Sequence, residues 1–309
     1  MSDNRSLIEL SQLSSEKIHN LFHQCLSLKD QFSHGKGASS PNYGIAVLLF
    51  FEPSTRTRFS FEAACARAGV HPLVLGGPTG TSLEKGETME DTILNLEAMR
   101  PLFFVIRCPD SLDLYDIQSK IKIPILNAGW GMRAHPTQAL LDTVTLFERW
   151  KTLKGKKVLF VGDIKHSRVV SSHKQLSEIL GYQVGFCAPS NLLPEQINSQ
   201  VEVFDRLQAG LKWADAVVAL RVQKERHASH MSSEEFVQQY RAEFGINLKN
   251  LENFKKEGLV LHPGPINYGV ELEQDVLKDS RSVILQLVEN GVFMRETLVR
   301  KIIEEGTNG

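Results

Sequence analysis

The sequence lacks several features that define whole classes of protein. Among 309 residues there are four cysteines, Cys25, Cys65, Cys108 and Cys187, with no CxxC pair and no histidine at ligand spacing. We therefore expect reduced, buried thiols rather than disulfides or a zinc site. The longest apolar run, 45–51, falls well short of the roughly 20 residues that span a bilayer as a helix. No membrane span is expected, and because the N-terminus lacks a secretion-signal pattern, we expect a cytoplasmic protein.

The chain also lacks a strong charge of either sign. Lysine and arginine total 35 and aspartate and glutamate total 36, so the net charge is 35 − 36 = −1. Nucleic acids and anionic membranes bind to cationic faces, and this composition gives no general attraction to either. Any affinity for anions must therefore come from local groups. Neither a metal ion nor a cofactor is expected.

What the sequence does have is the pattern of an α/β protein. At roughly 100 to 200 residues per domain, its length favours two domains. Short apolar runs rich in branched residues alternate with stretches of helical period, which predicts two parallel β-sheets flanked by helices. The expected strands are 45–51, 73–75, 103–107 and 123–126 in the first domain, and 158–161, 183–187, 216–220 and 259–261 in the second. Helices are expected from near Ser14, over 135–150 and over 283–303.

Polar residues follow the first expected strand. In open parallel sheets, ligands bind beyond the carboxyl ends of the strands. Residues 52–58 read E-P-S-T-R-T-R and lead into a helical stretch. Backbone N–H groups at a helix N-terminus, with hydroxyl and guanidinium donors beside them, favour an anion such as phosphate. The alternative is that Ser54 only caps the helix while Arg56 and Arg58 are solvated.

Further polar residues follow the other strands. These are Arg107, His135 and Gln138, and the strand 259–261 runs into H-P-G-P. Each alone would be an ion pair or a helix cap, but successive strand ends converge on one crevice. In the second domain, Arg168, Arg221 and Gln223 follow two strands. Each arginine alone could form a structural salt bridge, but together they suggest a substrate with carboxylates, which match the guanidinium fork.

Taken in order, these motifs resemble those of aspartate carbamoyltransferase catalytic chains. They are F-F-E-P-S-T-R-T-R from Phe50, T-S-x-x-K-G-E-T from Thr81, I-R from Ile106, N-A-G from Asn127, H-P-T-Q from His135, G-D-I-K-H-S-R from Gly162, R-V-Q-K-E-R from Arg221 and H-P-G-P from His262. The resemblance implies a carbamoyl-phosphate-binding domain over 1–135, completed by a C-terminal helix at about 285–309, and an aspartate-binding domain over 136–284. It also implies a homotrimer with shared active sites that makes N-carbamoyl-L-aspartate and phosphate, an early step of de novo pyrimidine biosynthesis.

The resemblance also implies roles for individual residues. Those expected to bind carbamoyl phosphate are Ser54, Thr55, Arg56, Thr57, Arg107, His135, Gln138, Pro263 and Gly264. Of these, Thr57, Arg107 and His135 would be catalytic groups facing the carbonyl oxygen, while Gln138 and the carbonyls of Pro263 and Gly264 would accept from the amino group. L-Aspartate would be bound by Lys85, Arg168, Arg221 and Gln223, with Ser82 and Lys85 supplied by the adjacent subunit. Glu52 would bridge to Arg168 and Arg226 and support a closed form.

Two alternatives remain beside this interpretation. Ornithine carbamoyltransferases share the first domain but carry H-C-L-P where this chain has H-P-G-P, and two arginines would repel the side-chain amine of ornithine. A non-catalytic phosphate-binding member of the fold should have lost the oxyanion donors, which this chain keeps. The surfaces that bind regulatory chains or a dihydroorotase have no short sequence signature. The sequence therefore leaves open whether this chain has either partner. Trp130 and Tyr268 depart from the usual pattern, and we expect both in loops bordering the cleft.

Overall fold

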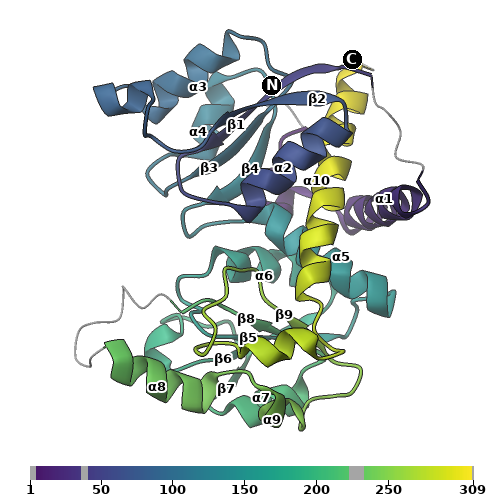
Figure 1. Cartoon of the computed structure of the whole chain (residues 1–309), viewed down its shortest axis with the longest axis vertical. Coiled ribbons are helices and arrows are strands. Elements are labelled where there is room, and N and C mark those ends of the chain that lie inside the picture. Colours follow the sequence, from purple (N-terminus) through teal and green to yellow (C-terminus); the bar gives the residue numbers. More distant parts are fainter. Residues whose placement is uncertain (1–4, 36–40, 223–232, 308–309) are drawn as a thin grey trace. The chain divides into compact units, whose positions relative to one another are not determined.

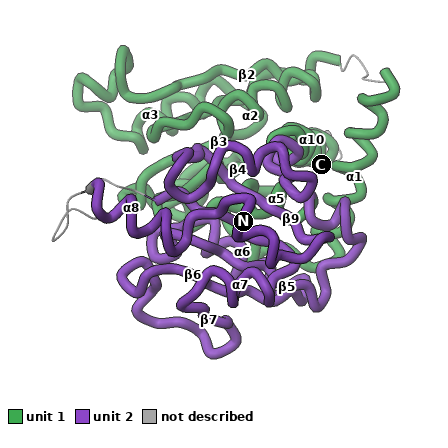
Figure 2. The backbone as a smooth tube through the Cα atoms, turned by 60° about the horizontal axis from the view of Figure 1, so that its bottom comes forward, with its two compact units in different colours: residues 1–144, 288–309 green, residues 145–287 purple. Residues whose placement is uncertain are grey.

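The structure, a computed structural model, describes residues 5–35, 41–222 and 233–307. The chain forms two compact units, Met1–Val144 with Val288–Gly309, and Thr145–Leu287 (Figure 2). Each unit contains one parallel β-sheet flanked by helices (Figure 1). The predicted fold class is therefore confirmed.

The first unit is built on a four-stranded parallel sheet of order β2-β1-β3-β4. Its strands are β1 Gly44–Phe50, β2 Val70–Leu75, β3 Phe104–Cys108 and β4 Ile125–Trp130. Its helices are α1 Ser15–Ser33, α2 Arg56–Arg67, α3 Met89–Glu97, α4 Leu114–Lys120, most of α10 Ile284–Thr307 and the first part of α5 Pro136–Trp150. Helices α3 and α4 cover one face of the sheet, where Ile93 and Ile117 pack with Val47 and Ile106. Because helices cover both faces, the strands read as continuous apolar runs.

The two terminal helices of the first unit form as the sequence predicts. Ser14 is the N-cap of α1, and its side chain accepts a hydrogen bond from the Lys17 backbone N–H at 3.2 Å. Such a bond satisfies one of the helix donors that have no partner within the helix. Helix α10 contacts α1, α2 and α5, with Lys29 of α1 donating to Asn290 at 2.8 Å. The C-terminal helix thus packs on the first unit, as expected from the family resemblance (Figure 1).

The second unit is built on a five-stranded parallel sheet of order β7-β6-β5-β8-β9. Its strands are β5 Lys157–Val161, β6 Gln183–Cys187, β7 Glu202–Phe204, β8 Ala216–Ala219 and β9 Leu259–Leu261. Its helices are α6 Arg168–Leu180, α7 Leu207–Trp213, α8 Ser233–Phe244 and α9 Leu248–Leu251. The sequence pattern gave no sign of β7, because this three-residue edge strand has no buried residue. Edge strands of this kind are short and half-exposed, so they carry no apolar run.

The cysteines are the buried thiols that the sequence predicts. All four are free and buried, and burial raises the pKa of both Cys65 and Cys187 to about 12. A thiol with such a pKa stays protonated and unreactive at neutral pH. Within the described ranges, no helix is long and apolar enough to cross a bilayer. The same ranges contain no group of three or more His, Cys, Asp or Glu residues placed to hold a metal ion.

Candidate active site

The first group of predicted site residues lies where the strand order of the first sheet reverses. From β1 the chain adds β2 on one side and then β3 on the other side of β1. The topological switch point, where the direction of strand addition changes, therefore lies between β1 and β3. Phe50 is paired in register with Arg107, and the Phe51 N–H donates to the Arg107 carbonyl at 2.9 Å. The S-T-R-T segment and Arg107 therefore leave the sheet side by side. In open parallel sheets this is the position of the ligand.

The N-terminus of α2 is arranged as an anion site. Its N-cap is Thr55, and no side chain forms a capping hydrogen bond there. The alternative in which Ser54 caps this helix is therefore wrong, although Arg58 does pair with Glu62 at 2.7 Å, one turn further on. Thr57 is buried in the first turn, whereas Arg56 is exposed, and partial desolvation of its guanidinium lowers the Arg56 pKa. Uncapped N–H groups beside hydroxyls and a guanidinium form a ready phosphate site.

Arg107 and Glu52 are close to each other in the first unit. The Arg107 Nε atom lies 3.6 Å from a Glu52 carboxylate oxygen, and the Arg107 side chain is largely buried. Glu52 therefore stands next to a guanidinium predicted to bind substrate. Of the partners expected for Glu52, Arg168 belongs to the second unit, and Arg226 lies outside the described residues.

His135 and Gln138 lie at the start of α5, beyond the end of β4. The His135 carbonyl accepts hydrogen bonds from the backbone N–H groups of Gln138 at 3.1 Å and Ala139 at 3.2 Å. Both predicted side chains are nearly buried, at 4% exposed for His135 and 8% for Gln138. The Gly131 N–H donates to the Cys108 carbonyl at 2.8 Å, which holds the end of β4 beside the end of β3. Arg107 and His135 thus belong to the same edge of the sheet.

Ser82 and Lys85 lie on a short 3₁₀ helix, Ser82–Lys85, in the loop that follows the carboxyl end of β2. Both residues are exposed, and Thr81 caps the helix by accepting from the Leu83 N–H at 3.3 Å. Exposed side chains on a surface loop are accessible to a second copy of the chain. Their contribution to a neighbouring site remains a prediction.

The second unit has its own switch point, between β5 and β8. The Leu220 N–H donates to the Val161 carbonyl at 2.8 Å, so Arg221 leaves β8 beside the segment that begins at Gly162. Gly162 has a φ of +123°, and a Cβ there would lie 2.7 Å from the Leu220 carbonyl oxygen. Only glycine fits this close approach of two backbones.

The same edge carries the arginines predicted to bind aspartate. Arg168 is the first residue of α6, whose N-cap Ser167 accepts from the Val170 N–H at 3.3 Å. Arg168 is half-buried and Arg221 is exposed. Arg168 and Arg221 therefore follow β5 and β8, the two strands that flank the switch point. Gln223, the third residue predicted to bind aspartate in this unit, lies outside the described residues.

A buried network shapes the loop after β9. The His262 Nδ1 accepts from the Gly264 N–H at 2.7 Å, so its Nε2 carries the proton and donates to Glu271 at 3.2 Å. The same Glu271 oxygen accepts from the Asn267 N–H at 2.6 Å. This network fixes the turn that contains Pro263 and Gly264. Sequence reasoning noted His262 only as part of H-P-G-P and missed Glu271, because no local pattern marks a buried acid nine residues away.

The structure corrects one expectation and explains another motif. Trp130 does not lie in a loop, because it is the last residue of β4 and is 1% exposed. Its ring packs edge-on against the Tyr115 ring, with 5.9 Å between the ring centroids. Tyr268 lies in the loop after β9 and is 49% exposed. Asn127 of the N-A-G motif has a structural role, since its amide donates to the Ile8 carbonyl at 2.8 Å and accepts from the Gly129 N–H at 2.7 Å.

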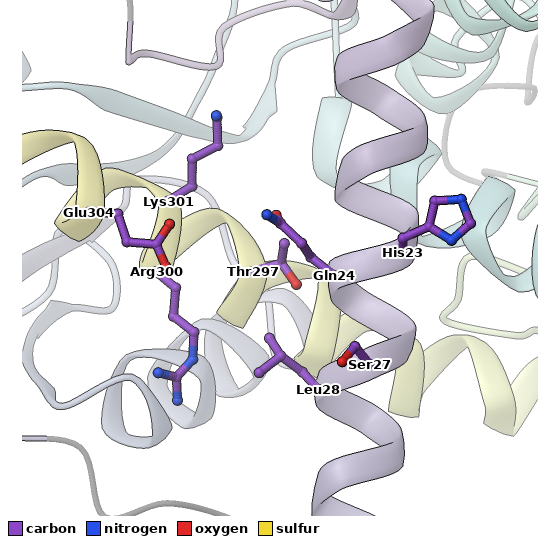
Figure 3. A pocket seen from close by; sticks show the side chains of 8 residues that line it. All are labelled: His23, Gln24, Ser27, Leu28, Thr297, Arg300, Lys301 and Glu304. Atoms are coloured by element: carbon purple, nitrogen blue, oxygen red, sulfur yellow. The ribbon is translucent and has the colours of Figure 1, made fainter.

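A surface pocket of the first unit lies between α1 and α10 (Figure 3). It is lined by His23, Gln24, Ser27, Leu28, Thr297, Arg300, Lys301 and Glu304. None of the residues predicted to bind a substrate is among them. The pocket is therefore not part of the candidate site.

Comparisons with known proteins point to the same family in both halves of the chain. The profile described as "Aspartate/ornithine carbamoyltransferase, carbamoyl-P binding domain" matches residues 5–148, and the corresponding "Asp/Orn binding domain" matches residues 154–302. The aspartate carbamoyltransferase catalytic subunit of Gemmatimonas aurantiaca is 40% identical over 294 residues, covering 94% of this chain and 91% of the relative. That of Prosthecochloris aestuarii is 40% identical over 309 residues, with 97% and 98% covered.

Solved structures agree with the sequence comparisons. Aspartate transcarbamoylase from Trypanosoma cruzi in complex with carbamoyl phosphate has a TM-score of 0.87 and 28% identity, covering 97% of this chain and 96% of that one. The same enzyme in complex with N-(phosphonacetyl)-L-aspartic acid has a TM-score of 0.83 and 28% identity, covering 97% and 95%. The likeness therefore extends over both units.

Proposed function

This chain belongs to the aspartate/ornithine carbamoyltransferase family, and we propose that it transfers the carbamoyl group of carbamoyl phosphate to the α-amino group of L-aspartate. The products are N-carbamoyl-L-aspartate and phosphate. The reaction supplies de novo pyrimidine biosynthesis. Ornithine carbamoyltransferase and a non-catalytic phosphate-binding role are the alternatives to be tested.

One observation carries the choice of aspartate: the two arginines at the switch point of the second sheet. Arg168 begins α6 after β5, and Arg221 follows β8, the neighbouring strand. Guanidinium groups bind carboxylates in a bidentate manner and repel an ammonium group. Aspartate offers two carboxylates to this edge, whereas ornithine would bring a cationic side chain.

Carbamoyl phosphate fits the switch point of the first sheet. Its phosphate would be held by the uncapped N-terminus of α2, with Ser54, Thr55 and Arg56 as additional donors. Its carbonyl oxygen would face Thr57, Arg107 and His135. Among these, Arg107 is beside the α2 segment through the pairing of β1 with β3.

The reaction is an attack by the neutral α-amine on the carbonyl carbon. A C–N bond forms, an oxyanion develops, and the C–O bond to phosphate then breaks while the phosphate takes up the amine proton. Donors aimed at the developing oxyanion supply the main electrostatic stabilisation. His135 acts as such a donor rather than as a general base, since the leaving phosphate already accepts the proton.

Charge balance supports this set of residues. Carbamoyl phosphate carries close to two negative charges and aspartate carries two carboxylates. The cations assigned to them are Arg56, Arg107, Arg168, Arg221 and Lys85. Opposite charges attract more strongly where water is excluded than in bulk solvent. Lys85 and Ser82 would come from an adjacent subunit of a homotrimer, which we expect to work in the cytoplasm.

The test is a product assay with carbamoyl phosphate and either L-aspartate or L-ornithine. We expect carbamoyl aspartate with aspartate and no citrulline with ornithine. Arg221→Ala should lower kcat/KM for aspartate by about 10- to 100-fold, the value of a charge-assisted hydrogen bond. The control is Arg241→Ala, in an exposed ion pair with Glu273 at 2.7 Å, which should leave kcat/KM unchanged. Citrulline as the product, or no product with either amino acid, would reject the proposal.

A further inference from the structure

We propose that Asp142 is a positioning residue that fixes the orientation of the Gln138 side-chain amide and so makes the site select a carbamoyl group over an acyl group. This inference rests on the proposed function, in which Gln138 accepts a hydrogen bond from the carbamoyl amino group. Asp142 does not belong to the motifs of the sequence analysis. It lies on α5 in the first unit, as Gln138 does.

The first step is the hydrogen bond between Gln138 and Asp142, which are one turn apart on α5. The Gln138 Nε2 donates to an Asp142 carboxylate oxygen at 2.9 Å. Asp142 is 0% exposed and Gln138 is 8% exposed, so water does not compete freely for this bond. An ionised carboxylate can only accept, and it therefore binds the NH₂ end of the amide. The carbonyl Oε1 of Gln138 is left as the atom that can accept from a substrate N–H.

The second step is the surroundings of Asp142. Arg295 of α10 is 3% exposed, and burial lowers its pKa to about 9, while the Asp142 charge acts in the opposite direction. The cation on α10 and the acid on α5 therefore attract each other inside the first unit. Asp142 thus has an oppositely charged group near it as well as the Gln138 amide.

The third step is that the same guanidinium also contacts α2. The Arg295 Nη1 donates to the Ser60 hydroxyl at 2.6 Å, and that hydroxyl donates to the Thr57 carbonyl at 3.1 Å. Ser60 and Thr57 are in the first turns of the helix predicted to bind phosphate. Gly291 makes room for this arrangement, because a Cβ there would lie 2.9 Å from Arg295 Nη1. The buried arginine thereby fixes the Ser60 side chain on α2.

The discriminating ligand is acetyl phosphate, which has a methyl group where carbamoyl phosphate has NH₂. In Asp142→Asn the neutral amide can bind either end of Gln138, so Oε1 is no longer held toward the substrate. We expect the affinity for carbamoyl phosphate to fall by about tenfold, the value of one hydrogen bond, while the inhibition constant of acetyl phosphate stays within about twofold. Glu148→Gln, a matched change on α5 where Glu148 accepts from Gln286 at 2.8 Å, should alter neither.

A second background separates positioning from a general structural role. In Gln138→Ala the amide is absent, so adding Asp142→Asn should not change the preference for carbamoyl over acetyl phosphate any further. If Asp142→Asn does not fold, as judged by circular dichroism, Asp142→Ser takes its place in the same cycle, because a hydroxyl can also bind either end of the amide. Equal loss of affinity for both phosphates, or a further loss of preference in the Gln138→Ala background, would overturn the inference. A wild-type chain that makes no carbamoyl aspartate would instead reject the proposed function itself.

Discussion

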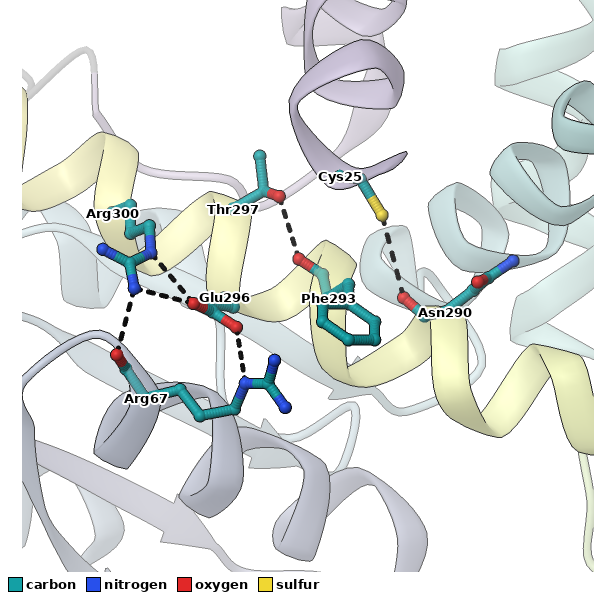
Figure 4. A network of polar contacts seen from close by, with 7 residues as sticks. All are labelled: Cys25, Arg67, Asn290, Phe293, Glu296, Thr297 and Arg300. Atoms are coloured by element: carbon teal, nitrogen blue, oxygen red, sulfur yellow. Dashed lines mark hydrogen bonds and ion pairs between the residues drawn. The ribbon is translucent and has the colours of Figure 1, made fainter. Parts of the chain in front are cut away.

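Replacing Arg67 should destabilise the first unit by an amount that its contacts allow us to estimate. Arg67 ends α2, and its Nε donates to Glu296 of α10 at 2.7 Å (Figure 4). Arg300 binds the other oxygen of the same carboxylate at 2.8 Å and donates to the Arg67 carbonyl at 3.0 Å. The Glu296 side chain is only 4% exposed, so its carboxylate is paired with these two guanidinium groups rather than with water.

The Arg67 guanidinium also contacts two aromatic rings. It lies 3.9 Å from the centre of the Phe32 ring on α1 and 4.4 Å from that of Phe293 on α10. Loss of a charge-assisted hydrogen bond costs about 1.5 to 3 kcal/mol. Loss of cation–π contacts costs about 0.5 to 2 kcal/mol. Since Arg300 still partners Glu296, Arg67→Ala should cost about 3 kcal/mol in total.

The assay is urea unfolding followed by far-UV circular dichroism at a fixed protein concentration. Arg67→Lys keeps the charge but loses the planar fork, so it should cost about half as much. The control is Lys301→Ala on α10, whose ion pair with Glu305 is 40% exposed on both sides. This change should cost less than about 0.5 kcal/mol. An Arg67→Ala chain within that same margin of the wild type would refute the reasoning.

Three further predictions concern catalysis, assembly and pH. His135→Ala should lower kcat by about 10²- to 10³-fold with little change in the binding of carbamoyl phosphate, and turnover within about threefold of wild type would contradict its role as an oxyanion donor. Inactive chains mutated at Lys85, mixed with inactive chains mutated at Arg56, should regain partial activity if sites are shared between subunits, whereas each chain alone should stay inactive. The hydrogen bonds of Arg281, at 2.6 and 2.8 Å, lower the pKa of Asp279 from its usual 3.8. The free energy of unfolding of the wild type should therefore exceed that of Asp279→Asn by a constant amount between pH 7 and pH 5. This difference should decline as the pH falls below about 3.8 toward the pKa of Asp279 in the folded state. A difference that grows on acidification would contradict this sign.

Sequence patterns predicted the elements whose signals are local. The Ser14 cap lies next to the helix that it starts, and the apolar runs of β1 and β9 are continuous in the chain. β7 left no such signal, since a short edge strand has one neighbour and no buried face. Trp130 was expected in a loop bordering the cleft, but burial of its large ring places it at the end of β4. Packing with distant residues decides such positions.

By itself, the sequence determined the fold class and the family, because these depend on short motifs and on the period of apolar residues. Only the tertiary structure decided the order of the strands, and hence that Arg107 leaves the first sheet beside the S-T-R-T segment. It likewise revealed Arg295 beside Ser60, 235 positions away in the chain. The physical reason is that hydrogen bonding and burial within a helix or strand are set by neighbours in sequence, whereas contacts between elements depend on which distant surfaces pack together.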